Sequence, residues 1–371
     1  MSRLWVLITA ALVVRAEGVL ADKVQEIERL VSAEMSRQTI PGLSIAIGAG
    51  AEVLWTAGFG MSDIENNVPV KALTQYRTGS IAKPITAVAV MQLAEAGKID
   101  LDAPVQRYVP SFPQKQWTIT IRQLLSHLGG IRHYNTPDET NVTRHYRDLL
   151  PALRMFQSDP LVAEPGTQYS YSTYGYVLLG AALEQVASQR YMEYVRQKIL
   201  RPTGMDRTRD DHVFAIIPNR ARGYVLNSAG QLQNCSLADT SYKIPGGGMI
   251  STAEDIVRFG LAVRAGTLCR PASVAAMFTP QKLRDGKPTG YGLGWSIAQV
   301  DGRRVVRHTG GQQGTSTILA MDPREGLAVA IMTNLEKAQL VELSYKILKS
   351  LSGVKTGRDQ RTGLVPALAR P

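Results

Sequence analysis

The sequence has few of the residues that metal sites and disulfide frameworks require. Its 371 residues include two cysteines, Cys235 and Cys269, and five histidines, and none of them stands in an HExxH or a Cys/His ligand spacing. We therefore expect no metal site and predict no cofactor. Neither cysteine lies near a stretch that looks catalytic, so a structural role or none is the default, and whether they pair stays open.

Long hydrophobic runs are scarce as well. Arg3 is followed by an apolar run from Leu4 to Val14, which is too short to span a bilayer. Small residues at Ala16 and Ala21 offer cleavage points, so residues 1–21 are expected to be a signal peptide and the protein to be exported, either periplasmic or secreted. An uncleaved anchor and a mitochondrial presequence are the alternatives. No later segment is apolar enough for a stable membrane span.

Acidic residues are outnumbered, with 31 Asp and Glu against 42 Lys and Arg, which gives a formal net charge of +11. The chain nevertheless lacks zinc-finger spacing, an RNP-like aromatic run and a basic heptad helix, so nucleic-acid binding is not predicted. Part of the excess lies in residues 352–371, which we expect to form a basic flexible tail. The hydrophobic fraction of 44% is ordinary for a globular protein.

Hydrophobic periodicity predicts one domain over residues 22–351, whose sheet is built from both ends of the chain. The strands are expected at residues 43–50, 53–60, 291–300, 303–310, 316–322 and 326–334. The helices are expected at residues 22–35, 81–96, 120–130, 175–188, 192–200, 252–264 and 337–351. The predicted fold is α/β (α+β): an antiparallel sheet from about 22–79 and 285–351, flanked by the terminal helices, with a mostly helical insert of about 80–284.

The stretch TGSIAKPIT places Ser80 and Lys83 one turn apart at the start of a predicted helix. A serine is a poor nucleophile until a base removes its proton, and residues three apart on a helix are neighbours. The helix N-terminus favours negative charge on the serine oxygen and lowers the proton affinity of the lysine. The pattern is weak alone, because a second S-x-x-K occurs at Ser352–Lys355, which we interpret as coincidence.

The stretch YSYSTYGYVLLG, residues 169–180, is rich in tyrosine, and an aromatic core or cleft wall is the plain interpretation. The functional interpretation places Tyr171 between Ser80 and Lys83. A lysine ammonium there would lower the pKa of the phenol, which would take the serine proton and later return it to the leaving group.

The stretch RRVVRHTGGQQG ends a predicted strand with His308, Thr309, Gly310 and Gly311. Glycine lets a substrate approach closely and pair along a strand. We expect the backbone N–H groups of Ser80 and Gly311 to form an oxyanion hole. In the alternative interpretation His308 is a surface strand residue and the glycines serve only the turn.

Together these stretches resemble the three motifs of the serine β-lactamases and penicillin-binding proteins, S-x-x-K, S-D-N and K-T-G, in the same order. A tyrosine in the second motif is similar to the class C branch with its esterase and D-peptidase relatives, and the likeness extends to the mitochondrial β-lactamase-like protein and its bacterial relatives. Further similar stretches are PGLSIAI (41–47), TIRQLLSHLGGI (120–131), GGGMISTAEDIVRF (246–259) and YGLGW (291–295). The resemblance, over about residues 23–350, implies that Ser80 is acylated, that Lys83 and Tyr171 share the proton transfer, and that His308 lines the site.

Two departures from the family pattern bear on the substrate. Thr173 replaces an asparagine whose amide would contact a substrate carbonyl or Lys83, and Thr173, Thr309 and Gly310 are the expected substrate-binding residues. His308 replaces the K-T-G lysine, and a histidine is mostly neutral at pH 7, so it offers less charge to a substrate carboxylate. Strand alternation places Arg307 on the opposite face from His308.

The leading hypothesis is a serine hydrolase that cleaves a peptide or ester through an acyl-enzyme. The first alternative is a β-lactamase or D-Ala-D-Ala carboxypeptidase acting on β-lactams or cell-wall peptides. The second is a non-catalytic penicillin-binding-like scaffold, since a fold does not fix a function. The expected partner is a small-molecule or peptide substrate, and a homo-oligomer is possible.

Overall fold

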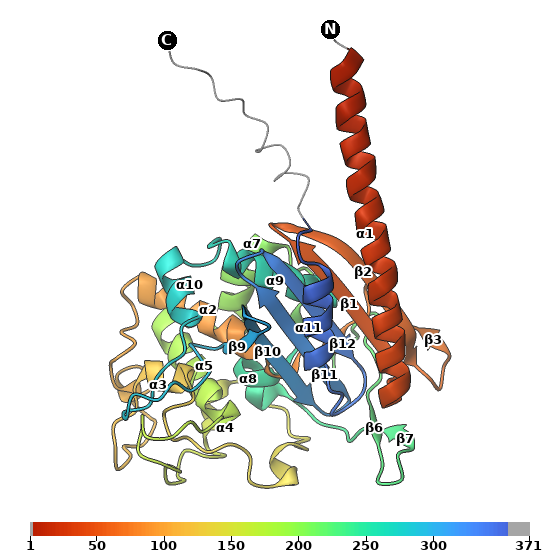
Figure 1. Ribbon diagram of the computed structural model, residues 1–371. Helices are drawn as coiled ribbons and strands as arrows, with labels where there is room; N and C mark the ends of the chain where they lie inside the picture. The colour runs from red at the N-terminus through yellow and green to blue at the C-terminus, as the bar shows by residue number, and fades with distance from the viewer. Residues whose placement is uncertain (1–2, 355–371) are drawn as a thin grey trace, which may run out of the picture.

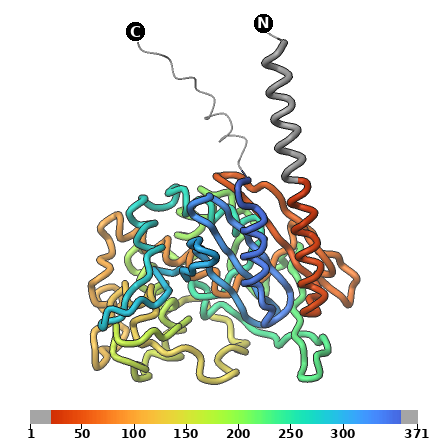
Figure 2. Tube along the Cα trace, viewed as in Figure 1, coloured from red at the N-terminus to blue at the C-terminus, as the bar shows by residue number. Residues whose placement is uncertain are grey.

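A seven-stranded antiparallel sheet forms the centre of the protein (Figure 1). The computed structural model describes residues 3–354, with side chains from residue 21 onward (Figure 2). The order of the strands across the sheet is β3-β2-β1-β12-β11-β10-β9. Their bounds are β1 Gly42–Ala49, β2 Glu52–Asp63, β3 Val68–Pro69, β9 Ser296–Val300, β10 Arg303–Gln312, β11 Thr315–Asp322 and β12 Leu327–Thr333.

The middle of the sheet joins the two ends of the chain. Strand β1 pairs with β12 along its whole length, with Ile45 opposite Ile331. Every residue of β1, β11 and β12 is buried, because helices cover both faces of these strands. The predicted fold class, an antiparallel sheet assembled from both chain ends and flanked by terminal helices, is confirmed.

The two terminal helices, α1 (Arg3–Gln38) and α11 (Val341–Ser350), pack side by side on one face of the sheet (Figure 1). Ile27 of α1 and Ile347 of α11 are fully buried there, in one apolar cluster with the outer residues of β1 and β12. The other face packs on α9 (Ala253–Arg264). No helix of the described chain is both long enough and apolar enough to span a membrane.

The region between the two halves of the sheet is mainly helical. Its other α-helices are α2 Ala82–Glu95, α3 Ile121–Leu125, α4 Leu149–Leu153, α5 Thr173–Ala187, α6 Tyr191–Val195, α7 Arg201–Thr203, α8 Ile244–Gly247 and α10 Pro271–Met277. A π-helical turn, Arg196–Leu200, joins α6 to α7, and the 3-10 turns are η1 Gly79–Ile81, η2 Val105–Arg107, η3 Pro137–Glu139 and η5 Ser241–Lys243.

Short strands that periodicity does not predict also lie in or beside this region. They form a three-stranded sheet and a two-stranded hairpin from β4 Tyr76–Arg77, β8 Met249–Ser251 and β5 Arg209–Asp210, and from β6 Tyr224–Leu226 and β7 Leu232–Asn234. Each has only two or three residues, which is too short for an alternating pattern to be visible in the sequence.

Several predicted boundaries differ from the structure, including the helix expected at residues 120–130, which ends at Leu125. The strand expected at 291–300 begins only at Ser296, because Gly294 has a φ of +86°, which breaks the extended run before it. The closing helix begins at Val341, and Lys337 precedes it with a φ of +60°. The N-terminal helix, expected from residue 22, has helical backbone from Arg3. The signal peptide stays a prediction, and residues 355–371 of the predicted tail lie outside the described residues.

Candidate active site

Ser80 lies in the 3-10 turn that leads directly into α2, at the floor of an open groove. Thr78 holds the turn in place: its N–H donates to the carbonyl of Met249 at 2.8 Å, and its carbonyl accepts from the hydroxyl of Thr317 on β11 at 2.8 Å. Gly79 has a φ of +51°, and a Cβ there would stand 2.6 Å from the backbone nitrogen of Gly311. Glycine at this position therefore lets β10 approach the nucleophile.

Lys83 follows one turn later and is fully buried. Its Nζ lies 2.8 Å from the hydroxyl of Ser80, 3.1 Å from the hydroxyl of Thr173 and 2.7 Å from the carbonyl oxygen of Gly246. Of these three partners only the carbonyl must accept, since a hydroxyl can also donate. A neutral amine fits all three, donating to Gly246 and Thr173 and accepting the Ser80 O–H.

Among the described side chains, residues 21–354, no carboxylate is paired with Lys83. Burial lowers its pKa well below the usual value, and the nearby cation Lys243 lowers it further. A lysine that gives up its proton in this way can act as a base. The structure thus brings the predicted nucleophile and its predicted partner together in the arrangement that proton transfer requires.

Tyr171 completes the group. The side chain of Ser80 is near enough to its phenol to lower the pKa, and the Nζ of Lys83 lies 4.8 Å from the centre of its ring. The expectation that an ammonium lowers the pKa of this phenol is wrong. Burial raises the pKa of Tyr171 because it disfavours the charged phenolate. Burial also disfavours the positive charge on Lys83, which would have lowered the pKa of the phenol. Tyr171 is therefore a phenol at neutral pH, suited to donate a proton.

Three of the five histidines surround Tyr171. The ring centres of His127, His133 and His308 lie 4.3, 5.6 and 6.4 Å from that of Tyr171. Burial lowers the pKa of His133 to about 4 and that of His127 well below its usual value. Both accept backbone N–H groups through Nδ1, from Thr173 at 3.2 Å and Ser172 at 3.1 Å respectively. They hold the second motif in place as neutral rings.

His308 lies behind the groove and does not line it. Its Nδ1 lies 2.7 Å from the carbonyl of Thr309 and its Nε2 lies 2.9 Å from the hydroxyl of Tyr291. A carbonyl only accepts, so Nδ1 carries the proton and Nε2 accepts from the tyrosine. The side chain is 3% exposed, and burial lowers its pKa to about 3. His308 shares its absence from the groove's lining with Tyr171 and Lys83, and its ring lies near Tyr171, so its place in the site stays a prediction.

The strand that carries His308 presents a free backbone edge to the groove. Strand β9 pairs with β10 only as far as Arg307. Gln312 pairs with Thr315 across a two-residue turn, so alternate residues of β10 bond to β11, and Thr309 and Gly311 turn their N–H and C=O groups to the open edge, where the carbonyl of Thr309 is already bound by His308. At Gly310 a Cβ would lie 3.1 Å from the backbone nitrogen of Ser80. The two predicted oxyanion donors, Ser80 and Gly311, thus face the same space.

The groove has a volume of about 550 Å³ and runs along this edge. Thr309 is exposed in it, and Thr173 lies at its floor, where its hydroxyl keeps the contact with Lys83 that the family's amide would make. As expected from alternation, Arg307 turns to the other face, where its guanidinium lies 5.7 Å from the ring centre of Tyr345 in α11.

Three residues of the site are not singled out by sequence reasoning. The carbonyl of Gly246 accepts from Lys83, His133 lines the groove, and Lys243 lines it as a buried cation. Gly246 lies in the similar stretch GGGMIST, but a backbone carbonyl leaves no mark in a side-chain motif. For Lys243 the available signal was a lysine in the apolar, glycine-rich stretch YKIPGGG.

The second S-x-x-K has no comparable surroundings. The hydroxyl of Ser352 accepts from Arg303 at 2.9 Å and donates to Glu325 at 2.9 Å, far along the chain from the groove. Lys355 lies outside the described residues. Cys235 and Cys269, whose pairing was open, are both free thiols.

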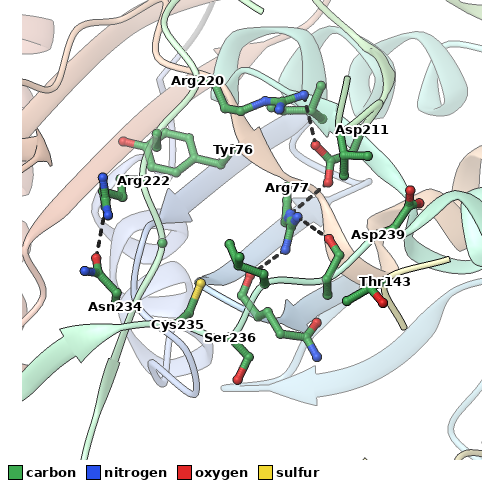
Figure 3. A pocket seen from close by; sticks show the side chains of 18 of the residues that line it. Tyr76, Arg77, Thr143, Asp211, Arg220, Arg222, Asn234, Cys235, Ser236 and Asp239 are labelled. Atoms are coloured by element: carbon green, nitrogen blue, oxygen red, sulfur yellow. Dashed lines mark hydrogen bonds and ion pairs between the residues drawn. The ribbon is translucent and has the colours of Figure 1, made fainter. Parts of the chain in front are cut away.

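Figure 3 shows a second hollow, with a volume of about 570 Å³. It lies next to the groove, because Gln313 lines both. Asp211 binds two arginines there, with its carboxylate 2.8 Å from Arg77 Nε and 3.3 Å from Arg220 Nη2. The thiol of Cys235 also faces this hollow, and burial raises its pKa. The hollow contains no serine or lysine in an arrangement like that of Ser80 and Lys83.

Comparison with known proteins agrees with this site. The family described as Beta-lactamase matches residues 27–350. The chain is 30% identical to the serine β-lactamase-like protein LACTB, mitochondrial, of Homo sapiens, over 83% of this chain and 76% of that protein. It is 28% identical to penicillin-binding protein 4* of Bacillus subtilis, over 85% and 72%. The octameric penicillin-binding protein homologue of Pyrococcus abyssi superposes with a TM-score of 0.77 and 26% identity, over 89% and 77%. The chain belongs to the β-lactamase family of serine hydrolases.

Proposed function

We propose that the protein cleaves a peptide or ester bond through an acyl-enzyme formed on Ser80. The observation that carries this proposal is the state of Lys83, a buried amine 2.8 Å from the serine hydroxyl with no carboxylate to keep it charged. Burying a lysine without a counter-ion destabilises a fold, so such a residue beside a serine in a groove marks a reactive site.

In the proposed reaction, the neutral amine of Lys83 takes the proton of Ser80 as the oxygen attacks the substrate carbonyl. The negative charge that develops on the carbonyl oxygen is bound by the N–H groups of Ser80 and Gly311. The bond to the leaving group then breaks and leaves an ester on Ser80. Water attacks this ester in the second half of the reaction, with the same base taking its proton and passing it to the oxygen of Ser80 as the acyl group leaves as a carboxylic acid.

Tyr171 supplies the proton that the leaving group needs. Its raised pKa keeps the phenol protonated at neutral pH, and its closeness to the side chain of Ser80 places it beside the atom that the leaving group departs from. The proton that Lys83 has gained must return to Tyr171 before the next turnover, and the oxygen of Ser80, 2.8 Å from the Nζ of Lys83, lies between the two groups in this proposed route. This route differs from one in which a phenolate removes the serine proton.

The surroundings of His308 favour ester or peptide hydrolysis over efficient β-lactam hydrolysis. Where the family's lysine would offer a positive charge, this side chain is neutral at physiological pH and both its ring nitrogens are engaged within the protein. The third motif therefore gives no charge to a substrate carboxylate.

Covalent labelling tests the proposal directly. We expect a fluorophosphonate to form one adduct on Ser80, identified by mass spectrometry of the digested protein. Ser80→Ala should abolish the adduct, whereas Ser352→Ala, in the second S-x-x-K, should leave it intact. Hydrolysis of p-nitrophenyl acyl esters should fall by about 10³-fold or more in Ser80→Ala.

Two results would count against the proposal. An adduct on another residue would assign the nucleophile elsewhere. A protein that forms no adduct and hydrolyses no ester or peptide of a broad library would favour the non-catalytic scaffold.

A further inference from the structure

The groove contains a buried cation that the reaction described above does not use. Lys243 ends the turn η5 and is 3% exposed, and it lines the groove together with Ser80 and Thr173. Its Nζ lies 5.5 Å from the ring centre of Tyr134 and 5.4 Å from that of Tyr242. Among residues 21–354 the structure gives its three N–H groups no hydrogen-bond acceptor.

The charge of Lys243 is not matched by a carboxylate of its own. Asp211, whose charge favours the ammonium, is bound to Arg77 and Arg220, and Arg77 acts on Lys243 in the opposite direction. Burial has the largest effect and lowers the pKa of Lys243 to about 7. Buried polar groups nearly always have a partner, so an ammonium with three free donors in a groove calls for an acceptor from the ligand.

The other cations near the groove do not offer the same opportunity. The donors of Lys83 are engaged by Ser80, Thr173 and Gly246. Arg307 also lines the groove, and its buried Nε has no hydrogen-bond partner among the described residues, but its guanidinium lies over the ring of Tyr345 in α11 and shares its charge with that ring. Lys337 is exposed on the rim, where water competes for its charge.

We infer that Lys243 binds a carboxylate of the substrate, so that the groove selects acyl compounds with a free carboxylate. The inference rests on the proposed hydrolase function and names its substrate class. A carboxylate fits better than a phosphate, because one ammonium balances one negative charge and the second charge of a phosphate would face the rings of Tyr134 and Tyr242.

The inference includes a pH dependence. The groups that face Lys243 are Lys83 of α2, His133 of the loop before η3, and Arg77 and Asp211 behind it. His133 is neutral above its pKa of about 4 and does not change charge near neutrality, whereas burial brings the pKa of Lys243 to about 7. Its protonated fraction falls as the pH rises through about 7, and the preference for a carboxylate falls with it.

A matched pair of substrates tests the inference. Hippuryl-phenyllactate is an ester with a free carboxylate, and its carboxamide differs only in that group. We expect the wild type to show a kcat/KM at least about tenfold higher for the acid than for the carboxamide on the acid side of pH 7. Lys243→Met should reduce this ratio to about one, mainly through the acid's KM, and Lys243→Arg should keep most of it. Lys337→Met, which removes a lysine from the rim of the same groove, should keep the wild-type ratio.

Binding to an inactive variant separates the inference from the proposed function. In Ser80→Ala, calorimetry should show that the acid binds more tightly than the carboxamide, and the added Lys243→Met change should remove the difference. If the wild type cleaves neither ester while this binding difference is present, the hydrolase proposal fails and the carboxylate site stands. Equal binding of acid and carboxamide, or a preference that survives in Lys243→Met, overturns the carboxylate site. Lys243→Arg decides the question should the Met variant not fold.

Discussion

The groove at Ser80 and the neighbouring hollow at Arg77 have similar volumes but treat buried charge in opposite ways. In the hollow, Asp211 is 1% exposed and binds two arginines, so cation and anion are taken out of water together (Figure 3). In the groove, Lys83 and Lys243 are buried with no carboxylate bound to either. Volume alone would have favoured the hollow, which is slightly larger.

The comparison teaches that a buried charged side chain is structural when an opposite charge is bound to it and reactive when none is. Its burial and the volume of the pocket around it are less informative. A cation in an ion pair stays protonated and therefore cannot act as a base. An unpaired lysine is pushed toward the neutral amine, which is the form that accepts a proton or waits for a ligand anion. The fold carries the stability cost of such residues only where they serve a function.

Lys83→Met tests whether the unpaired lysine of the groove is the base, and we expect it to have the largest effect on activity. Removing the base should lower kcat/KM by about 10³-fold or more in steady-state assays with an ester substrate. Because an unpaired buried amine is replaced by an apolar chain of similar length, the free energy of unfolding should fall by no more than about 1 kcal/mol. Lys98→Met, at an exposed position just after α2, is the control and should change neither quantity. A Lys83→Met protein with near-normal turnover would show that the amine is not the base.

Asp211→Ala tests the ion pairs of the hollow and should have the opposite effect, a loss of stability with little change in activity. Removing the shared anion leaves Arg77 and Arg220 partly buried without a counter-ion, so the free energy of unfolding should fall by about 3 kcal/mol in urea titrations. Activity per folded molecule should stay within about threefold of the wild type, since Asp211 does not contact Ser80 or Lys83.

The matched control for this change is Asp285→Ala, which removes a solvent-exposed partner of Lys287 and should leave stability unaltered. If Asp211→Ala abolished turnover in a protein that stays folded, the hollow could no longer be regarded as purely structural.

Much of the fold could be predicted from the sequence because its central strands are continuous apolar runs between turn residues. Strands β1 and β12 are of this kind, and their pairing follows from the short connections and helices at both chain ends. The stretch YGLGW misled because its alternating aromatic and glycine residues mimic a strand. Whether glycine serves an extended run or a turn depends on its φ, which no residue pattern states.

In the candidate site, the positions of the main residues could be predicted, but their protonation states could not. Ser80 and Lys83 are neighbours by helix geometry alone, and the resemblance to a known family indicated Tyr171 and the edge of β10. The protonation of these groups could not be predicted, because it depends on what surrounds them after folding: His127 and His133 pack against Tyr171 from a distant segment. Lys243 escaped notice for the same reason, since the sequence does not show that no carboxylate binds it.

His308 is a third kind of buried group, a base that burial keeps neutral. We expect His308→Gln to have the smallest effect of the three substitutions. Glutamine offers one donor and one acceptor, so it can replace the bonds to Thr309 and Tyr291. The folded-state pKa of His308, about 3, lies below the unfolded value of about 6.5. Its contribution to stability is therefore complete above pH 6.5 and is lost as the pH falls from there toward about 3, because the unfolded chain takes up a proton that the folded one refuses.

Urea titrations of both proteins at pH 7 and pH 5 would measure this contribution. Between these two values the wild type should lose about 2 kcal/mol more stability than His308→Gln, whatever the two proteins' difference at pH 7. Taking the difference between pH values removes any packing defect that the substitution introduces, because such a defect is present at both. Parallel loss of stability in the two proteins would mean that His308 is protonated in the folded state, and a second positive charge would then lie near Tyr171, beside the one that we assign to Lys243.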